Sequence, residues 1–212
     1  MNEELNVVET FISLKGEGLW TGKPMFFIRL GGCNLSCSFC DTDWKHSIPR
    51  KVSSLLRDVA ESKMQHVVIT GGEPLLQENV FNLIDELRRK GFKVHIETNG
   101  TLLLPVEVDW LAVSPKTLDC GCSTIFQANE VKFLWDPALG FNSTFIFQFV
   151  DKYRHELQYT LMYVMPIAKS VHEGNRSITD LKQENVKGAI DFCLKHPQFS
   201  FCLQIHKVLG IQ

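Results

Sequence analysis

Three cysteines lie within eight residues of one another in this chain. Cys33, Cys37 and Cys40 have the spacing C-x3-C-x2-C and follow closely on the apolar run 25–30. Thiolates are soft metal ligands, and four of them usually hold an iron–sulfur cluster. Because this loop supplies three thiolates and no obvious fourth, it predicts a cluster in which one iron stays open for a substrate or a cofactor.

A structural zinc site is the alternative explanation of these cysteines. Zinc in such sites normally takes four ligands, commonly from paired C-x2–4-C knuckles. Cys120 and Cys122 could complete the set, although they form no second knuckle at ordinary spacing. A zinc-binding interaction module is therefore a second hypothesis, of a different functional class.

A glycine pair follows the next apolar run, in the motif Gly71-Gly72-Glu73-Pro74. A strand, a turn and a proline in the first turn of a helix would explain this motif by structure alone. Two glycines also let a backbone approach a ligand closely, and Glu73 could accept a hydrogen bond from an ammonium group. Next to an open cluster, the motif becomes a strong functional signal.

Short apolar strands alternate with amphipathic helices along the chain, which implies βα units and a mostly parallel sheet. We therefore expect an α/β fold, an open, partial βα barrel of about six mostly parallel strands with shortened helices. The predicted strands are 6–12, 25–30, 66–69, 93–97, 110–113, 130–135, 160–165 and 199–205. The predicted helices are 52–62, 77–90, 142–153 and 180–195, the last with Ile190, Cys193 and Leu194 facing inward.

The chemically unusual residues share one position, because each group follows the end of a predicted strand. In parallel α/β folds the carboxyl ends of the strands form one rim, where sites are built. We expect that rim to hold the cysteine loop, Gly71-Gly72-Glu73-Pro74, Thr98-Asn99-Gly100, Ser114-Pro115-Lys116 and His206.

Composition narrows the class of protein. The 212 residues are 44% hydrophobic, with no repeat or linker, so we expect a single domain over 1–212. A net charge of −2 predicts neither nucleic-acid nor membrane binding. No secretory signal and no apolar run of about 18 residues is found, so we expect a soluble, cytoplasmic protein. Seven cysteines then favour metal or redox chemistry over disulfides.

The cysteine spacing, with Phe39 before the last cysteine and the Gly-Gly-Glu-Pro motif beyond it, resembles the radical S-adenosylmethionine superfamily. The resemblance implies a [4Fe-4S] cluster on Cys33, Cys37 and Cys40. It also implies that the amino and carboxylate groups of S-adenosylmethionine chelate the open iron. The reduced cluster would cleave the sulfonium to a 5′-deoxyadenosyl radical, so no further catalytic residue is expected.

A narrower resemblance covers nearly the whole chain. The loop 13–18 is similar to the T-L-Q-G-E-G loop of the 7-carboxy-7-deazaguanine synthase family, and further motifs at 40–42, 97–100, 114–116 and 204–212 match in order. The resemblance implies a carbon–nitrogen lyase of queuosine-precursor (7-deazapurine) biosynthesis. It would convert 6-carboxy-5,6,7,8-tetrahydropterin to 7-carboxy-7-deazaguanine with loss of ammonia and would re-form S-adenosylmethionine. Another small radical enzyme, such as a glycyl-radical-activating enzyme, is the alternative within the superfamily.

The same resemblance implies roles for individual residues. Thr42 would coordinate Mg²⁺, with Asp41 as a rival ligand. Substrate would be bound by Leu14, Lys15, Gly16, Glu17, Arg29, Thr98 and the terminal carboxylate of Gln212. S-Adenosylmethionine would be bound by Phe39, Gly71, Gly72, Glu73, Gly100, Ser114, Pro115, Lys116 and Met165.

Several of these residues also have ordinary explanations. Arg29 could form a surface ion pair, Lys116 could be a surface lysine, and His206 could be a core histidine. Lys15 stands where the family pattern has Gln, so contacts from its side chain are in doubt. The family further suggests a homodimer and an external electron donor such as flavodoxin.

Overall fold

The computed structural model describes residues 3–40, 42–173 and 176–211. Within these residues one sheet has the strand order β11-β8-β7-β6-β5-β4-β2-β1-β3, and a separate hairpin joins β9 to β10. The strands of the large sheet are β1 (Glu4–Leu14), β2 (Pro24–Leu30), β3 (Ile48–Lys51), β4 (His66–Gly71), β5 (Lys93–Thr98), β6 (Trp110–Val113), β7 (Glu130–Trp135), β8 (Leu161–Pro166) and β11 (Ser200–Phe201). The hairpin consists of β9 (Ala168–Glu173) and β10 (Arg176–Leu181).

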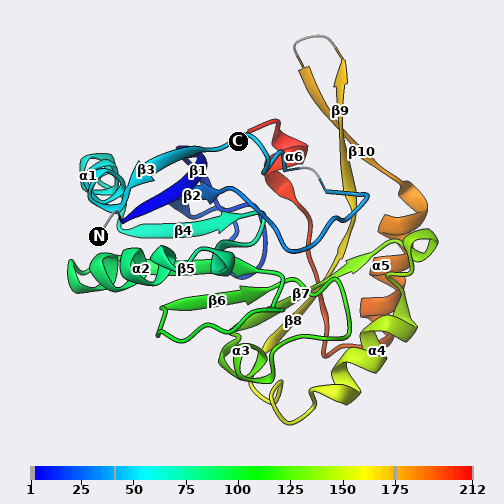
Figure 1. Ribbon diagram of the computed structural model, residues 1–212. Coiled ribbons are helices and arrows are strands. Elements are labelled where there is room, and N and C mark those ends of the chain that lie inside the picture. Colours follow the sequence, from blue (N-terminus) through cyan, green and yellow to red (C-terminus); the bar gives the residue numbers. More distant parts are fainter. Residues whose placement is uncertain (1–2, 41, 174–175, 212) are drawn as a thin grey trace.

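The sheet is parallel from β2 across to β11 and antiparallel where β1 pairs with β2 and β3. Its edges, β3 and β11, do not pair with each other, so the expected open barrel is confirmed. The helices are α1 (Val52–Ser62), α2 (Asn79–Arg89), α3 (Cys122–Gln127), α4 (Ser143–Lys152), α5 (Gln183–Lys195) and α6 (Ile205–Leu209). Helices α1 to α5 cover the outer side of the curved sheet, α6 lies at its open side, and the β9–β10 hairpin extends away from it (Figure 1).

Strand alternation determines which side chains face the helices and which face the hollow of the sheet. In β5, Val94 and Ile96 belong to the main hydrophobic core, whereas Glu97 points into a cavity. In β7, Val131 and Phe133 join that core, whereas Lys132 faces the same cavity. The period of two therefore places charged residues of two strands on one interior surface.

Helix 52–62 and strands 110–113 and 130–135 have the predicted limits, and the other predicted strands up to residue 166 are confirmed to within a few residues, whereas β3 was not predicted. The ambiguous segment 142–153 is helix α4, capped by the Asn142 side chain, which accepts a hydrogen bond from the Phe145 N–H. The predicted helix 77–90 is confirmed but begins at Asn79, because Pro74–Leu76 first forms a 3-10 turn.

Three predictions near the C-terminus were wrong. Helix α5 begins at Gln183, because the preceding residues form strand β10. Its buried face contains Asn185, Ala189 and Phe192. Of the residues predicted to face inward, Cys193 is partly buried against the core, whereas Ile190 is 38% and Leu194 78% exposed. The ring of Trp135 lies against Gly188, and only a face with a glycine admits that approach. The predicted strand 199–205 is only Ser200–Phe201, because the chain turns into helix α6 at Ile205.

Among the described residues, none of the helices combines the length and the hydrophobicity that crossing a membrane requires.

Candidate active site

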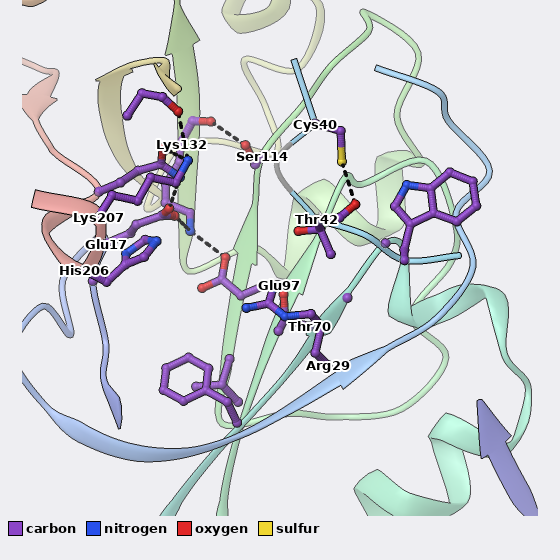
Figure 2. A pocket seen from close by; sticks show the side chains of 18 of the residues that line it. Glu17, Arg29, Cys40, Thr42, Thr70, Glu97, Ser114, Lys132, His206 and Lys207 are labelled. Carbon is purple, nitrogen blue, oxygen red and sulfur yellow. Dashed lines mark hydrogen bonds and ion pairs between the residues drawn. The ribbon is translucent and has the colours of Figure 1, made fainter. Parts of the chain in front are cut away.

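A cavity of about 730 Å³ lies at the carboxyl ends of the parallel strands. Figure 2 shows side chains from both halves of the chain pointing into it. The expected meeting of the strand ends is confirmed, because the cysteine loop, the glycine pair 71–72, the segments 97–99 and 114–116, and His206 all contribute to its walls. The predicted site residues can therefore be located relative to this cavity.

The three cysteines of the loop line one wall of this cavity. Burial raises the pKa of the Cys33 and Cys37 thiols, and the nearby Cys40 raises both further. Cys40 is exposed, and its Sγ lies 3.6 Å from the backbone oxygen of Thr42. Three thiols that repel one another as anions, on a wall open to solvent, suit binding to a cationic metal cluster.

The arrangement does not favour a structural zinc site. Among the described residues, no three His, Cys, Asp or Glu side chains come close enough to hold a single metal ion. The Cys120 Sγ lies 3.7 Å from the backbone oxygen of Asn99. The described residues therefore form no site with the four ligands that structural zinc takes.

The glycine pair at the end of β4 brings that strand against the cysteine loop. Gly71 has φ +150°, and a Cβ there would overlap the backbone of Leu30. A Cβ on Gly72 would overlap the Gly32 carbonyl and would lie 2.8 Å from Cys33 Cβ. The Glu73 N–H donates to the Gly32 oxygen at 2.9 Å, so backbone hydrogen bonds fix this contact. Only glycine allows the backbone to approach the cluster wall this closely.

Glu73 lies beneath the cavity rather than on its wall. Its side chain is fully buried, and burial raises the pKa of its carboxyl. It accepts hydrogen bonds from Thr98 Oγ1 at 2.8 Å, the Asn99 N–H at 2.8 Å and the Leu75 N–H at 3.1 Å. These contacts join the ends of β4 and β5, so in this structure Glu73 organises the rim.

Most other residues of the predicted cofactor set line the cavity. Lys116 donates to the Ser114 backbone oxygen at 2.8 Å, and its charge lowers the pKa of Cys37, which is raised overall by burial. Phe39 and Met165 belong to one apolar cluster with Phe141, which forms a hydrophobic wall. Gly100 and Pro115 are not among the lining residues. Gly100 has φ +81°, and a Cβ there would lie 2.7 Å from Val113, so its role in this structure is conformational.

The predicted substrate residues Leu14, Lys15, Gly16, Glu17, Arg29 and Thr98 all line the cavity, as does Thr42 on the metal side. Arg29 does form the ion pair considered above, through Nε to Glu9 Oε1 at 2.8 Å. Its guanidinium also lies 5.6 Å from the centre of the Phe11 ring. Its two terminal nitrogens make no hydrogen bond to the described residues, so they can still bind a carboxylate. Gln212, like Asp41, lies outside the described residues.

Lys132 and its ion pairs form a charged network in the cavity wall that was not predicted from the sequence. Lys132 is 2% exposed and pairs with Glu17 at 2.6 Å and with Glu97 at 2.5 Å. Lys15 pairs with the other oxygen of Glu97 at 2.6 Å. The sequence did contain a signal, because Lys132 lies inside the otherwise apolar run Val131–Trp135. A lysine in a buried strand is rarely found without charged partners, so its position indicates an ion pair.

Burial works against each of these charges, but the opposite charges prevail. Burial alone would raise the pKa of Glu17 and Glu97. The charges of Lys132 and Lys15 nevertheless hold the pKa of Glu17 well below its usual value and the pKa of Glu97 below its usual value. Burial would lower the pKa of Lys132, yet Glu17 and Glu97 hold it well above the usual value. All three groups are therefore ionised at neutral pH.

The C-terminal segment packs against the loop that carries Glu17. The Ile205 N–H donates to the Gly16 oxygen at 3.0 Å, and Gln204 Nε2 donates to Glu17 Oε1 at 2.8 Å. His206 is half-buried on the cavity wall rather than in the core, and it fills the space where a Cβ on Gly16 would lie. The sequence correctly marked this tail as unusual, but its contacts with residues nearly 190 positions away depend on the fold.

The chain is similar in sequence to known proteins. Residues 27–124 match the model of the Radical SAM superfamily. The chain is 31% identical over 212 residues to the 7-carboxy-7-deazaguanine synthase of Haemophilus influenzae, with 98% of this chain and 94% of the relative covered. It is 33% identical over 229 residues to the enzyme of the same name from Bradyrhizobium diazoefficiens, with 97% and 98% covered.

The fold also matches a solved structure. The crystal structure of QueE from Escherichia coli has a TM-score of 0.73 and covers 94% of this chain and 93% of its own. Its sequence identity is 24%, so this likeness concerns the fold.

Proposed function

The chain belongs to the 7-carboxy-7-deazaguanine synthase family, and we propose that it converts 6-carboxy-5,6,7,8-tetrahydropterin to 7-carboxy-7-deazaguanine with release of ammonia. One observation carries the proposal. A single cavity joins a wall of three thiols and a glycine turn to an ionised carboxylate, Glu17, and an arginine, Arg29. The thiols and the glycine turn suit the radical cofactor. Glu17 and Arg29 suit a substrate that has a carboxylate and a ring edge rich in hydrogen-bond donors.

The residues present fit the cofactors that this family implies. Cys33, Cys37 and Cys40 would hold a [4Fe-4S] cluster, and S-adenosylmethionine would lie against Gly71 and Gly72. Bound together, these groups supply the carbon-centred radical that takes a hydrogen atom from the substrate. Phe39 and Met165 offer apolar contact for the adenosine, and Lys116 offers a charge for the methionine carboxylate. The tight turn that Glu73 braces fixes the position of these contacts.

Different residues bind the two ends of the substrate, its carboxylate and its pyrimidine edge. The terminal nitrogens of Arg29 bind the substrate carboxylate as a planar fork. The carboxylate of Glu17 accepts hydrogen bonds from the amino group and ring N–H of the pyrimidine edge, and the hydroxyl of Thr98 contacts the ring. Gln212 is proposed as a further substrate contact, because the segment before it packs on the Glu17 loop.

We extend the proposal to Mg²⁺, to the electron donor and to assembly. Thr42 lines the cavity beside Cys40, where its hydroxyl and the substrate carboxylate would give Mg²⁺ the oxygen ligands it prefers. An external low-potential donor such as flavodoxin would reduce the cluster in the cytoplasm, and the protein would form a homodimer. Analytical ultracentrifugation tests the dimer, and omission of Mg²⁺ from turnover assays tests the metal.

Turnover of the reconstituted protein tests the function. Anaerobic protein with cluster, S-adenosylmethionine, reductant and 6-carboxytetrahydropterin should form 7-carboxy-7-deazaguanine and ammonia, detected by mass spectrometry and an ammonia assay. The absence of this product, in a sample shown to cleave S-adenosylmethionine, would overturn the assignment. A colourless, air-stable preparation without iron would instead support the zinc module.

A further inference from the structure

A line of four alternating charges runs along one side of the cavity. Its members are Lys15, Glu97, Lys132 and Glu17, and consecutive side chains are 2.5–2.6 Å apart. The side chain of Lys132 is 2% exposed, whereas those of Glu17 and Glu97 keep 15% and 16% of their surface accessible. Lys132 is therefore the more deeply buried group, and the two carboxylates are the more accessible ones.

The fold itself does not require these charges. Burying ions is unfavourable unless every charge is paired, so a lysine that is only 2% exposed on the cavity face of β7 adds a cost that an apolar side chain would not. The placement of Lys132 between two carboxylates that face a ligand cavity points instead to a role in binding.

The hydrogen bonds of Glu17 show what that role is. Its Oε1 accepts from Gln204 Nε2 at 2.8 Å, and its Oε2 accepts from Lys132 Nζ at 2.6 Å. An ionised carboxylate has about four lone-pair sites, so two of these contacts leave capacity for two more donors. The protein contacts on both oxygens fix the plane of the carboxylate, and the remaining capacity faces the cavity.

We propose that Lys132 is a positioning residue that holds Glu17 as an oriented, charged acceptor for the amino and N–H groups of the substrate's pyrimidine edge. This inference rests on the proposed function, because it takes that edge as the ligand of Glu17. Lys132 acts through Glu17, so its effect falls on recognition of the amino group rather than on the radical chemistry.

The surroundings of Glu17 explain why Lys132 matters most. Burial raises the pKa of this carboxyl, and Lys132, Lys15 and His206 lower it, in that order of size. Lys132 is the one of these three with a hydrogen bond to Glu17 among the described contacts. The charged, titratable or polar groups described as interacting with Glu17 are Lys15, Glu97, Lys132, Cys202, Gln204 and His206. Glu130 interacts with Lys132, and Lys207 donates to Gln204.

Equilibrium binding of 6-carboxypterin to the reconstituted holoenzyme with S-adenosylmethionine tests the proposal. This oxidised pterin keeps the carboxylate and the amino-pyrimidine edge but has no hydrogen at C6, so binding is measured without turnover. Because a hydrogen bond to a charged group contributes more than a neutral one, Lys132→Met should weaken binding by about 10- to 100-fold at pH 7.

A second ligand separates recognition from a general loss of structure. In 6-carboxylumazine an oxo group replaces the 2-amino group, so Glu17 loses a donor. The wild-type enzyme should prefer the pterin by about tenfold or more, and Lys132→Met should lose most of that preference. Burial raises the pKa of Glu17, and without Lys132 this is opposed by fewer cations, so pterin binding by Lys132→Met should weaken more steeply than wild-type binding as the pH falls below 7.

Two further variants control for folding and for overall charge. Lys152→Met removes an exposed lysine paired with Asp119 outside the cavity and should leave both affinities unchanged. The double variant Lys132→Met/Glu97→Gln removes one charge of each sign, so its thermal stability should recover towards wild type while pterin binding stays weak.

Each outcome of these binding experiments either supports or overturns the inference about Lys132. Full recovery of pterin binding in the double variant would show that Lys132 only balances charge, and equal weakening of both ligands in Lys132→Met would show a structural role. Either result overturns the inference. A wild-type enzyme that forms no 7-carboxy-7-deazaguanine while cleaving S-adenosylmethionine would refute the proposed function, whereas turnover with equal affinity for both ligands would refute only the inference.

Discussion

Replacing Gly72 by alanine should weaken cluster binding through the backbone alone. Gly72 follows β4 and touches the cysteine loop, with its N–H donating to the Leu30 oxygen at 3.1 Å. An added Cβ would overlap the Gly32 carbonyl and would lie 2.8 Å from Cys33 Cβ. The partners are backbone atoms and a Cβ, so no flexible side chain can swing away to make room.

The size of the effect follows from these distances. Carbon atoms in good contact lie about 3.5–4.0 Å apart, so Cys33 would have to move by roughly 0.7–1.2 Å. Forcing an extra methyl group into a packed region typically costs about 1–3 kcal/mol. If the loop recovers its cluster geometry only at that cost, cluster affinity falls by about 5- to 150-fold.

Iron and sulfide content after anaerobic reconstitution, with the visible absorbance of the cluster, measures this loss. Competition with an iron chelator gives the relative affinity. Gly121→Ala is the matched control, because a Cβ there meets nothing closer than 3.6 Å and its backbone is not left-handed. A Gly72→Ala protein that retains wild-type iron under chelator and binds S-adenosylmethionine normally would refute the role assigned to the glycine pair.

Three further changes probe the surroundings of the site. Glu73→Gln places an amide N–H₂ opposite one of the buried groups that donate to Glu73, so two donors then face each other. Urea unfolding of the cluster-free protein should show a free energy of unfolding lower by about 1–3 kcal/mol. Burial and His66 lower the pKa of His95 to about 4, so the unfolded state takes up the proton first as the pH falls below about 6.5. The wild-type protein should therefore lose about 2 kcal/mol of stability from this group between pH 7 and pH 5, and His95→Phe should remove that dependence in the same unfolding assay. Lys15→Gln, which introduces the residue of the family pattern, should weaken 6-carboxypterin binding less than Lys132→Met does, because Lys15 pairs with Glu97 while Lys132 keeps its ion pair with Glu17.

The elements that the sequence predicted well are those in which one pattern dominates. The apolar stripe of α1 and the fully apolar run of β6 have the predicted limits, because neither competes with another packing choice. The meeting of the cysteine loop with Gly71-Gly72 was also predictable, since parallel strands bring their carboxyl ends to one edge.

The errors arose where a distant partner decides the local structure. The buried face of α5 depends on Trp135, whose ring packs on Gly188 and Phe192 from a strand about fifty residues earlier. The ion pair between Glu17 and Lys132 joins positions 115 residues apart, so no local pattern relates them. The period of β7 could place Lys132 on the inner face, but only the curvature of the sheet shows which carboxylates it meets.

The charge balance of the network offers an explanation for the departure at position 15. With a neutral residue there, Lys132 would be the one described cation paired with both Glu17 and Glu97. Like charges in a buried site oppose each other's ionisation, so one of the two carboxylates would tend to take up a proton. Lys15 supplies a second cation on the far oxygen of Glu97, at 2.6 Å, and its charge also lowers the pKa of Glu17. Lys15 therefore supports the ionised state of Glu17 without touching it, and the substitution that cast doubt on a substrate contact instead strengthens the acceptor beside it.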